Sequence, residues 1–197
     1  MPRKPPWFLA LGAVTGLLSA VATLLPLPEA PAPRLFGFCF GINSPGGRCE
    51  GLDASVYLFP GLIFGVGFAA AQTWRGRFGA GRAIAFLLAS TIANAIAVFF
   101  CLGLFMLFSD LTDITFLDAP LALAGAIAGA IGGGLLSVAT ARLVPGVTVC
   151  RSIIVATLLG LLVPLVTELQ VAGIFLFYIV WQAGYSLALA SGLPRRS

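Results

Sequence analysis

Six long runs of apolar residues, separated by short polar or proline-rich segments, define the hydropathy pattern of this chain. They cover residues 7–25, 56–74, 83–108, 121–140, 152–167 and 171–191. A helix needs about 20 apolar residues, within a range of about 17 to 25, to cross a bilayer. The pattern therefore predicts an all-α, polytopic integral membrane protein, with six transmembrane helices in a single membrane domain over residues 1–197.

Three of the runs have features that affect this prediction. The first is longer than the apolar core of about 7 to 15 residues in a signal peptide, so we expect it to be a retained span. The third is long enough to tilt in the bilayer, whereas the fifth is short and contains Pro164. Only Glu168, Leu169 and Gln170 separate the fifth run from the sixth, which predicts a tight hairpin.

The basic residues indicate the orientation of the spans. If the N-terminus is cytoplasmic, six spans return the C-terminus to the same side, and nine of the eleven basic residues lie inside. These nine are Arg3, Lys4, Arg75, Arg77, Arg82, Arg142, Arg151, Arg195 and Arg196. Arg34, Arg48 and all seven acidic residues then lie outside. Because cytoplasmic loops carry the excess of lysine and arginine, we predict that both termini are cytoplasmic.

The composition agrees with a lipid environment. Only 9% of the residues are charged and 59% are hydrophobic, whereas a soluble domain carries about 25% charged residues. The basic residues are scattered beside apolar runs and do not cluster with aromatics, so we expect no nucleic-acid partner. Arginine outnumbers lysine ten to one among the eleven basic residues. With abundant alanine and glycine, this bias indicates a GC-rich bacterial genome, and hence a location in the bacterial inner membrane.

Two of the four cysteines lie in the predicted outer loop, residues 26–55. Cys39 and Cys49 flank a turn-forming Asn-Ser-Pro-Gly-Gly segment, on the side of the membrane where disulfides persist. A structural Cys39–Cys49 disulfide is therefore our prediction, with two free thiols as the alternative. The loop also carries an apolar cluster, which fits either a lid over the helices or contact with lipid headgroups. Cys101 and Cys150 are expected to be small packing residues.

Small residues recur at four-residue spacing within several spans. Gly125, Gly129 and Gly133 fall on one face of the fourth span, and Gly12 and Gly16 do the same in the first. Such faces let helices approach closely in lipid. They fit packing within the chain or docking onto the helices of another membrane protein.

Ionisable side chains are missing from the predicted spans, where they would mark proton relays or ion coupling. The sequence contains no histidine, and no nucleophile, base and orienting group fall together in it. A zinc site would need further cysteine or histidine ligands. We therefore expect no catalytic residues, no metal and no cofactor.

A few uncharged polar residues remain as candidates for ligand binding. Tyr178, Gln182 and Tyr185 share one face of the sixth span, and Asn94 lies in the third. At 1.5 Å per residue, Asn94 and Gln182 lie about 17 and about 14 Å from the cytoplasmic ends of their spans. They therefore fall near the middle of the bilayer, where they either cross-link helices or line a small polar pocket opposite Pro164.

Two functional hypotheses follow from these observations. The first is a non-enzymatic subunit or scaffold of a membrane complex, whose partners are the lipid bilayer and the helices of other membrane proteins. The alternative is a membrane-embedded module that binds or passes a small neutral or amphipathic molecule.

Overall fold

The computed structural model of the protein describes residues 7–24, 54–111 and 118–190, and these residues are almost entirely helical. The helices are α1 (Trp7–Leu24), α2 (Ala54–Trp74), α3 (Ala80–Leu111), α4 (Asp118–Leu143), α5 (Val149–Gly160), α6 (Pro164–Glu168) and α7 (Gln170–Ala190). Their apolar stretches form six candidate membrane spans, with α5 and α6 together making the fifth. The prediction of an all-α chain with six helices long and apolar enough to cross a membrane is confirmed.

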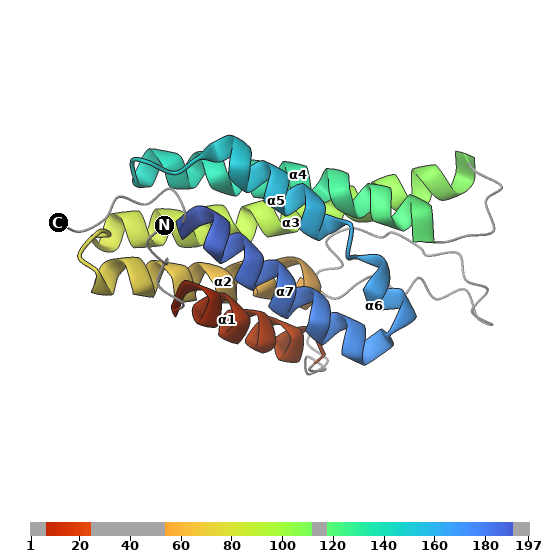
Figure 1. The fold of residues 1–197 in the computed structure, drawn as a ribbon, viewed down its shortest axis with the longest axis horizontal. Coiled ribbons are helices and arrows are strands. Elements are labelled where there is room, and N and C mark those ends of the chain that lie inside the picture. Colours follow the sequence, from red (N-terminus) through yellow and green to blue (C-terminus); the bar gives the residue numbers. More distant parts are fainter. Residues whose placement is uncertain (1–6, 25–53, 112–117, 191–197) are drawn as a thin grey trace, which may run out of the picture.

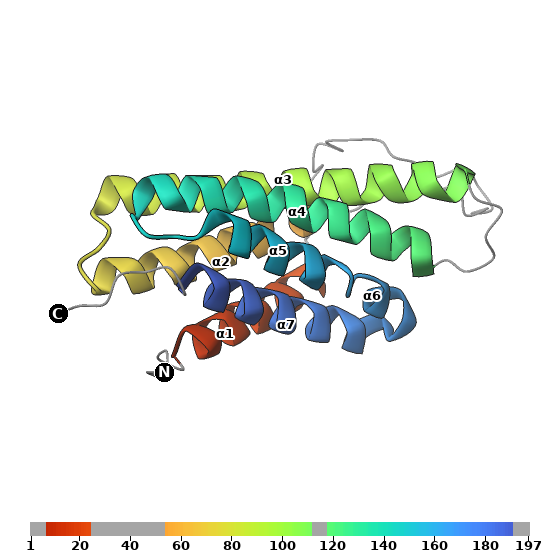
Figure 2. The same ribbon diagram turned by 45° about the horizontal axis from the view of Figure 1, so that its top comes forward.

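The long helices form an antiparallel ring (Figures 1 and 2). Each helix packs against the next along the chain, from α1 to α5, and α7 then packs against both α5 and α1 to close the ring. Aromatic side chains fill part of the interior: Phe64 lies 5.9 Å from Phe68 and 6.1 Å from Tyr185 between ring centroids. The first and last spans of the sequence are therefore neighbours.

Large aliphatic side chains cover the outside of the ring. On α3, Ile84, Leu88 and Ile92 recur at four-residue spacing, and each is more than half exposed. Full burial of such a side chain is worth about 1.5–3 kcal/mol, so a surface made of them is costly in water and favourable in hydrocarbon.

The charged residues separate between the two ends of the bundle. The α2–α3 and α4–α5 connections lie at one end, and the end of α3, the start of α4 and the α6–α7 turn lie at the other (Figure 1). The first end carries the described basic residues Arg75, Arg77, Arg82, Arg142 and Arg151. The second end carries the described acidic residues Asp110, Asp118 and Glu168. The cytoplasmic location of the basic end stays a prediction.

The fifth predicted span, residues 152–167, consists of two helices and not one. Pro164 has no N–H to donate to the carbonyl of Gly160. The N–H of Val163 donates to that oxygen instead, at 3.1 Å, and tightens the chain into a turn between α5 and α6. The predicted hairpin follows at Leu169, where Gln170 adopts a φ of 49°.

Two of the four cysteines, Cys101 and Cys150, lie within the described residues. Cys39 and Cys49 and their predicted disulfide lie outside the described residues, as does the outer loop as far as residue 53. Cys101 and Cys150 are free thiols. Cys150 is exposed at the start of α5, so the expectation that it packs between helices is wrong.

Candidate functional site

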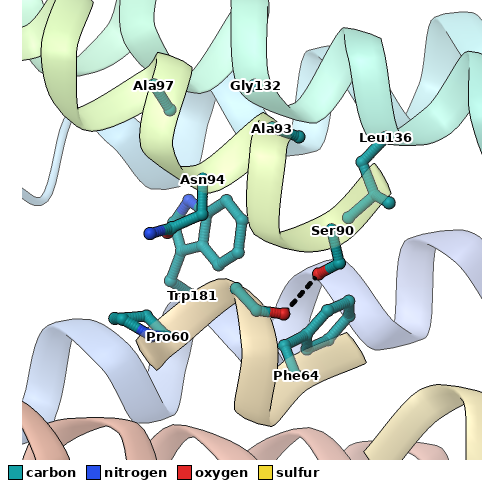
Figure 3. A pocket seen from close by; sticks show the side chains of 10 residues that line it. Pro60, Phe64, Ser90, Ala93, Asn94, Ala97, Gly132, Leu136 and Trp181 are labelled. Atoms are coloured by element: carbon teal, nitrogen blue, oxygen red, sulfur yellow. Dashed lines mark hydrogen bonds between the residues drawn. The ribbon is translucent and has the colours of Figure 1, made fainter. Parts of the chain in front are cut away.

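A small cavity lies inside the ring, between α2, α3, α4 and α7 (Figure 3). Its volume is about 30 Å³, which is enough for a water molecule but not for an organic solute. Its lining residues are Pro60, Gly61, Phe64, Ser90, Ala93, Asn94, Ala97, Gly132, Leu136 and Trp181. Apolar side chains and small residues make up most of the wall, and Ser90 and Asn94 are its polar members.

The polar wall of the cavity is built around Pro60, which interrupts the hydrogen-bond ladder of α2. Because proline lacks an N–H, the carbonyl four residues earlier loses its usual donor. That carbonyl belongs to Val56, and the Nδ2 of Asn94 in α3 reaches it at 3.5 Å. The shorter bond of the same Nδ2, at 2.6 Å, goes to the next carbonyl oxygen, that of Tyr57. The side chain thus fastens α3 to the first turns of α2.

Ser90 makes a second link between α3 and α2, one helical turn away from Asn94. Its hydroxyl donates to the carbonyl oxygen of Gly61 at 2.7 Å, the bond drawn in Figure 3. The backbones can approach this closely because Gly61 has no side chain. A Cβ there would lie 2.6 Å from the carbonyl oxygen of Ser90 and 2.7 Å from the Cβ of Asn94.

Gln182 links α7 to two other helices. Its Nε2 donates to the hydroxyl oxygen of Ser19 in α1 at 2.8 Å and to the carbonyl oxygen of Pro60 in α2 at 3.4 Å. The side chain is 1% exposed, and its Oε1 has no hydrogen-bond partner within the described part of the chain. The amide therefore joins three helices and retains one unused acceptor.

Tyr185 links α7 to α4 on the other side of the ring. Its hydroxyl lies 2.6 Å from the carbonyl oxygen of Gly133 and 2.8 Å from the hydroxyl of Ser137. Its ring stacks on Trp181 with a centroid separation of 5.2 Å. Tyr185 is completely buried, so this contact has no access to solvent or lipid.

This cavity does not bring the four predicted ligand residues together. Asn94 lines the cavity, whereas Gln182, Tyr178 and Tyr185 are not among its lining residues. Asn94 and Gln182 both reach carbonyl groups of α2 near Pro60. Tyr178 is half-buried, with its ring centroid 5.4 Å from that of Phe177.

The proline beside the cavity is also not the expected one. Pro60 is among the lining residues, whereas neither α5 nor α6, which begins at Pro164, contributes to the wall. The prediction that Pro164 lies opposite the pocket is therefore wrong. The sequence does not predict that Pro60 and Trp181 border a cavity, although a proline inside an apolar span is a visible signal of an interrupted helix.

The glycine faces lie against other helices of the same chain. Cβ atoms at Gly125 and Gly129 would collide with the carbonyl oxygens of Gly160 and Ala156, and one at Gly133 with the side chain of Ala156. All three contacts belong to the α4–α5 interface.

The first span repeats this arrangement against α7. Cβ atoms at Gly12 and Gly16 would collide with the carbonyl oxygens of Gln182 and Tyr178. Both glycine faces are therefore already occupied by helices of this chain.

The described residues contain no group of three or more histidine, cysteine, aspartate or glutamate side chains able to hold a metal ion. The chain matches no protein-family model, and no curated protein or solved structure shows significant similarity to it. Its function must therefore be inferred from its residues and their geometry.

Proposed function

We propose that the chain is a non-catalytic, multi-pass protein of the bacterial inner membrane that acts as a subunit or scaffold of a membrane complex. We place both termini, and the arginine-bearing end of the bundle, in the cytoplasm. One observation carries the proposal: among the described residues, the polar side chains of the ring interior bind neighbouring helices, and the cavity that Asn94 borders measures only about 30 Å³.

The hydrogen bonds support a structural role for these side chains. The side chains of Asn94, Ser90 and Tyr185 each donate a hydrogen bond to a backbone carbonyl oxygen of another helix, at 2.6 to 2.7 Å. A ligand that used these groups would have to displace bonds that hold the ring together. Interhelical hydrogen bonds of this kind stabilise membrane proteins by about 0.6 kcal/mol on average.

The packing of the small residues refines the scaffold proposal. The faces formed by Gly125, Gly129 and Gly133 and by Gly12 and Gly16 are occupied within the chain. Because these glycine faces already pack helices of this chain together, we place the contacts with a partner protein on the outer aliphatic surface of the ring.

Gentle detergent extraction followed by mass spectrometry of the retained molecules tests the proposal. We expect a second membrane protein in stoichiometric amount and no stoichiometric organic ligand. A small organic molecule held at one copy per chain, without a protein partner, would contradict it.

The alternative, a binding or permeation module, is favoured by one feature. Asn94 and Trp181 border the cavity, and the buried Oε1 of Gln182 lacks a partner among the described residues. If the alternative holds, an Asn94→Ala variant should lose a co-purifying small molecule. Thr91→Ala is the matched control, because the Thr91 hydroxyl binds Leu87 of its own helix.

A further inference from the structure

The cavity inside the ring has a size that suits an internal water molecule. Its volume of about 30 Å³ exceeds the roughly 10–15 Å³ that one water molecule needs. Such a molecule also needs polar partners, typically about three of them. Whether this cavity suits water therefore depends on what its hydrogen-bonding side chains, Ser90, Asn94 and Trp181, can offer.

The first group is an acceptor, the Oδ1 of Asn94. Carbonyl oxygens only accept hydrogen bonds, so the end of the amide that faces Tyr57 and Val56 must be the Nδ2 group. Among the described residues, both hydrogen bonds of this side chain start from Nδ2. Oδ1 is therefore left as an unused acceptor on a side chain that borders the cavity.

The second group is also an acceptor, the hydroxyl oxygen of Ser90. Its single proton is donated to the carbonyl oxygen of Gly61 at 2.7 Å, so a further bond can use only the lone pairs of the oxygen. Ser90 is 2% exposed and lies one turn of α3 away from Asn94. Because residues four apart share one face of a helix, the two acceptors lie along the same wall of the cavity.

The third group is a donor and comes from α7. The indole Nε1 of Trp181 can donate one hydrogen bond and accept none, and within the described part of the chain it makes no hydrogen bond. Figure 3 shows the Trp181 ring beside Asn94 at the cavity. Since α3 and α7 are not neighbours in the ring, a molecule held between these side chains would link two helices across the interior.

We infer that the cavity binds one ordered water molecule that bridges α3 and α7. Its two hydrogens match the two acceptors, Asn94 Oδ1 and Ser90 Oγ, and its oxygen accepts from Trp181 Nε1. The direct bonds of α7 across the ring reach α2 at Pro60 and α4 at Gly133, so the water adds a link to α3. This inference goes beyond the scaffold proposal and does not depend on a partner protein.

Radiolytic labelling tests the site, because an X-ray pulse converts bound water into hydroxyl radicals that oxidise the side chains beside it. The purified chain is irradiated in neutral detergent, and mass spectrometry of its peptides locates the oxidised residues. Phe64 lines the cavity and is 2% exposed, whereas Phe68, one turn further along α2, is fully buried and is not a lining residue. We expect Phe64 to be oxidised at least about fivefold faster than Phe68, because only Phe64 borders the water.

A variant tests whether these polar groups hold the water. Asn94→Leu replaces the acceptor by an apolar side chain of similar size, so Phe64 should then be oxidised no faster than Phe68. Thr91→Val is the matched control, because the hydroxyl that it removes binds within α3, and it should leave the oxidation of Phe64 unchanged. If Asn94→Leu fails to fold, Ser90→Ala is measured in its place and should slow the oxidation of Phe64 at least about twofold, because one of the three partners is lost.

Two results would overturn the inference. Equal protection of Phe64 and Phe68 in the unchanged chain would show that the cavity holds no water. Undiminished oxidation of Phe64 in Asn94→Leu, or in Ser90→Ala where that variant is used, would show that the radicals arrive from bulk solvent. Either result would leave the proposed function standing, because that proposal is tested by the molecules retained after extraction.

Discussion

At the scale of single residues, this protein holds its helices together with uncharged polar groups that bind backbone carbonyl oxygens. Pro60 explains why α2 needs them, because its ring removes one backbone donor in the middle of an apolar helix. Asn94 and Gln182 approach the affected turns from two different helices. In lipid no water is available to bind freed backbone groups, so side chains from neighbouring helices must do so.

Replacement of Asn94 by alanine should lower the free energy of unfolding. The variant loses the bond to the Tyr57 carbonyl oxygen, and we expect a cost of about 0.6 kcal/mol, with an upper bound of about 1.7 kcal/mol. Thermal unfolding in mild detergent measures the change. Thr91→Ala is the control, because the bond it loses lies within α3, and it should be less destabilised than Asn94→Ala. Equal destabilisation of the two variants would contradict the interhelical role of Asn94.

The Tyr185 hydroxyl should couple energetically to Ser137. Tyr185→Phe removes the group that lies 2.8 Å from the Ser137 hydroxyl and 2.6 Å from the Gly133 carbonyl oxygen. In a double-mutant cycle with Ser137→Ala, we expect a coupling energy of at least about 0.5 kcal/mol, because residues in one hydrogen-bond network are not additive. Strictly additive losses would show that the two hydroxyls do not act together.

The residue scale also shows where sequence reasoning stops. The depths of Asn94 and Gln182 follow from counting residues along their helices. Their partners do not, because the acceptors are backbone carbonyl oxygens of α2, and every residue has one. Which carbonyls are reached depends on how the helices are rotated against each other.

At the scale of elements, small residues decide which helices touch. Gly129 brings α4 onto α5, and Gly12 and Gly16 bring α1 onto α7. Such close backbone contacts replace the hydrophobic driving force, which is absent between helices in lipid. The small-residue face of α4 packs against α5, the next helix along the chain. The small-residue face of α1 packs against α7, which is the farthest described helix in sequence.

A Gly129→Ala substitution should disturb the α4–α5 interface. The added methyl group would overlap the carbonyl oxygen of Ala156, and such overpacking costs about 1–3 kcal/mol. Gly103→Ala is the control, because a Cβ at Gly103 meets nothing within 4 Å. Thermal unfolding should show a loss for Gly129→Ala and none for Gly103→Ala, and similar losses would contradict the assignment of this interface.

The extent of the helices could largely be predicted from hydropathy, but their interruptions could not. The predicted run 121–140 lies within α4, Asp118–Leu143, because the helix continues past the apolar core at both ends. The short fifth run was recognised, yet its division into α5 and α6 depends on the bond from Val163 to the Gly160 carbonyl oxygen. Such a local exchange of backbone partners has no hydropathy pattern of its own.

At the scale of the whole molecule, the helices form a ring with arginines at one end and acids at the other (Figure 1). Loop charges predict the same separation, because successive connections alternate between the two sides of the membrane and the basic residues fall in every second one. The order of the helices around the ring required the structure, since no motif in the sequence marks α7 as the neighbour of α1.

The predicted Cys39–Cys49 disulfide can be tested by counting thiols. Cys101 and Cys150 are free, so alkylation of the denatured, unreduced chain should modify two cysteines, and alkylation after reduction should modify four. Intact-mass measurement reads the count directly. Four modified cysteines without reduction would exclude the disulfide.

The central claim is that the chain crosses the membrane with its arginine end in the cytoplasm. Single cysteines in an otherwise cysteine-free chain test it, at Thr148 beside the arginine end and at Glu168 at the opposite end, both of which are exposed. With a membrane-impermeant maleimide on intact cells, we predict labelling of Glu168→Cys, and labelling of Thr148→Cys only after permeabilisation. Labelling of Thr148→Cys in intact cells, or of both positions equally, would contradict the account.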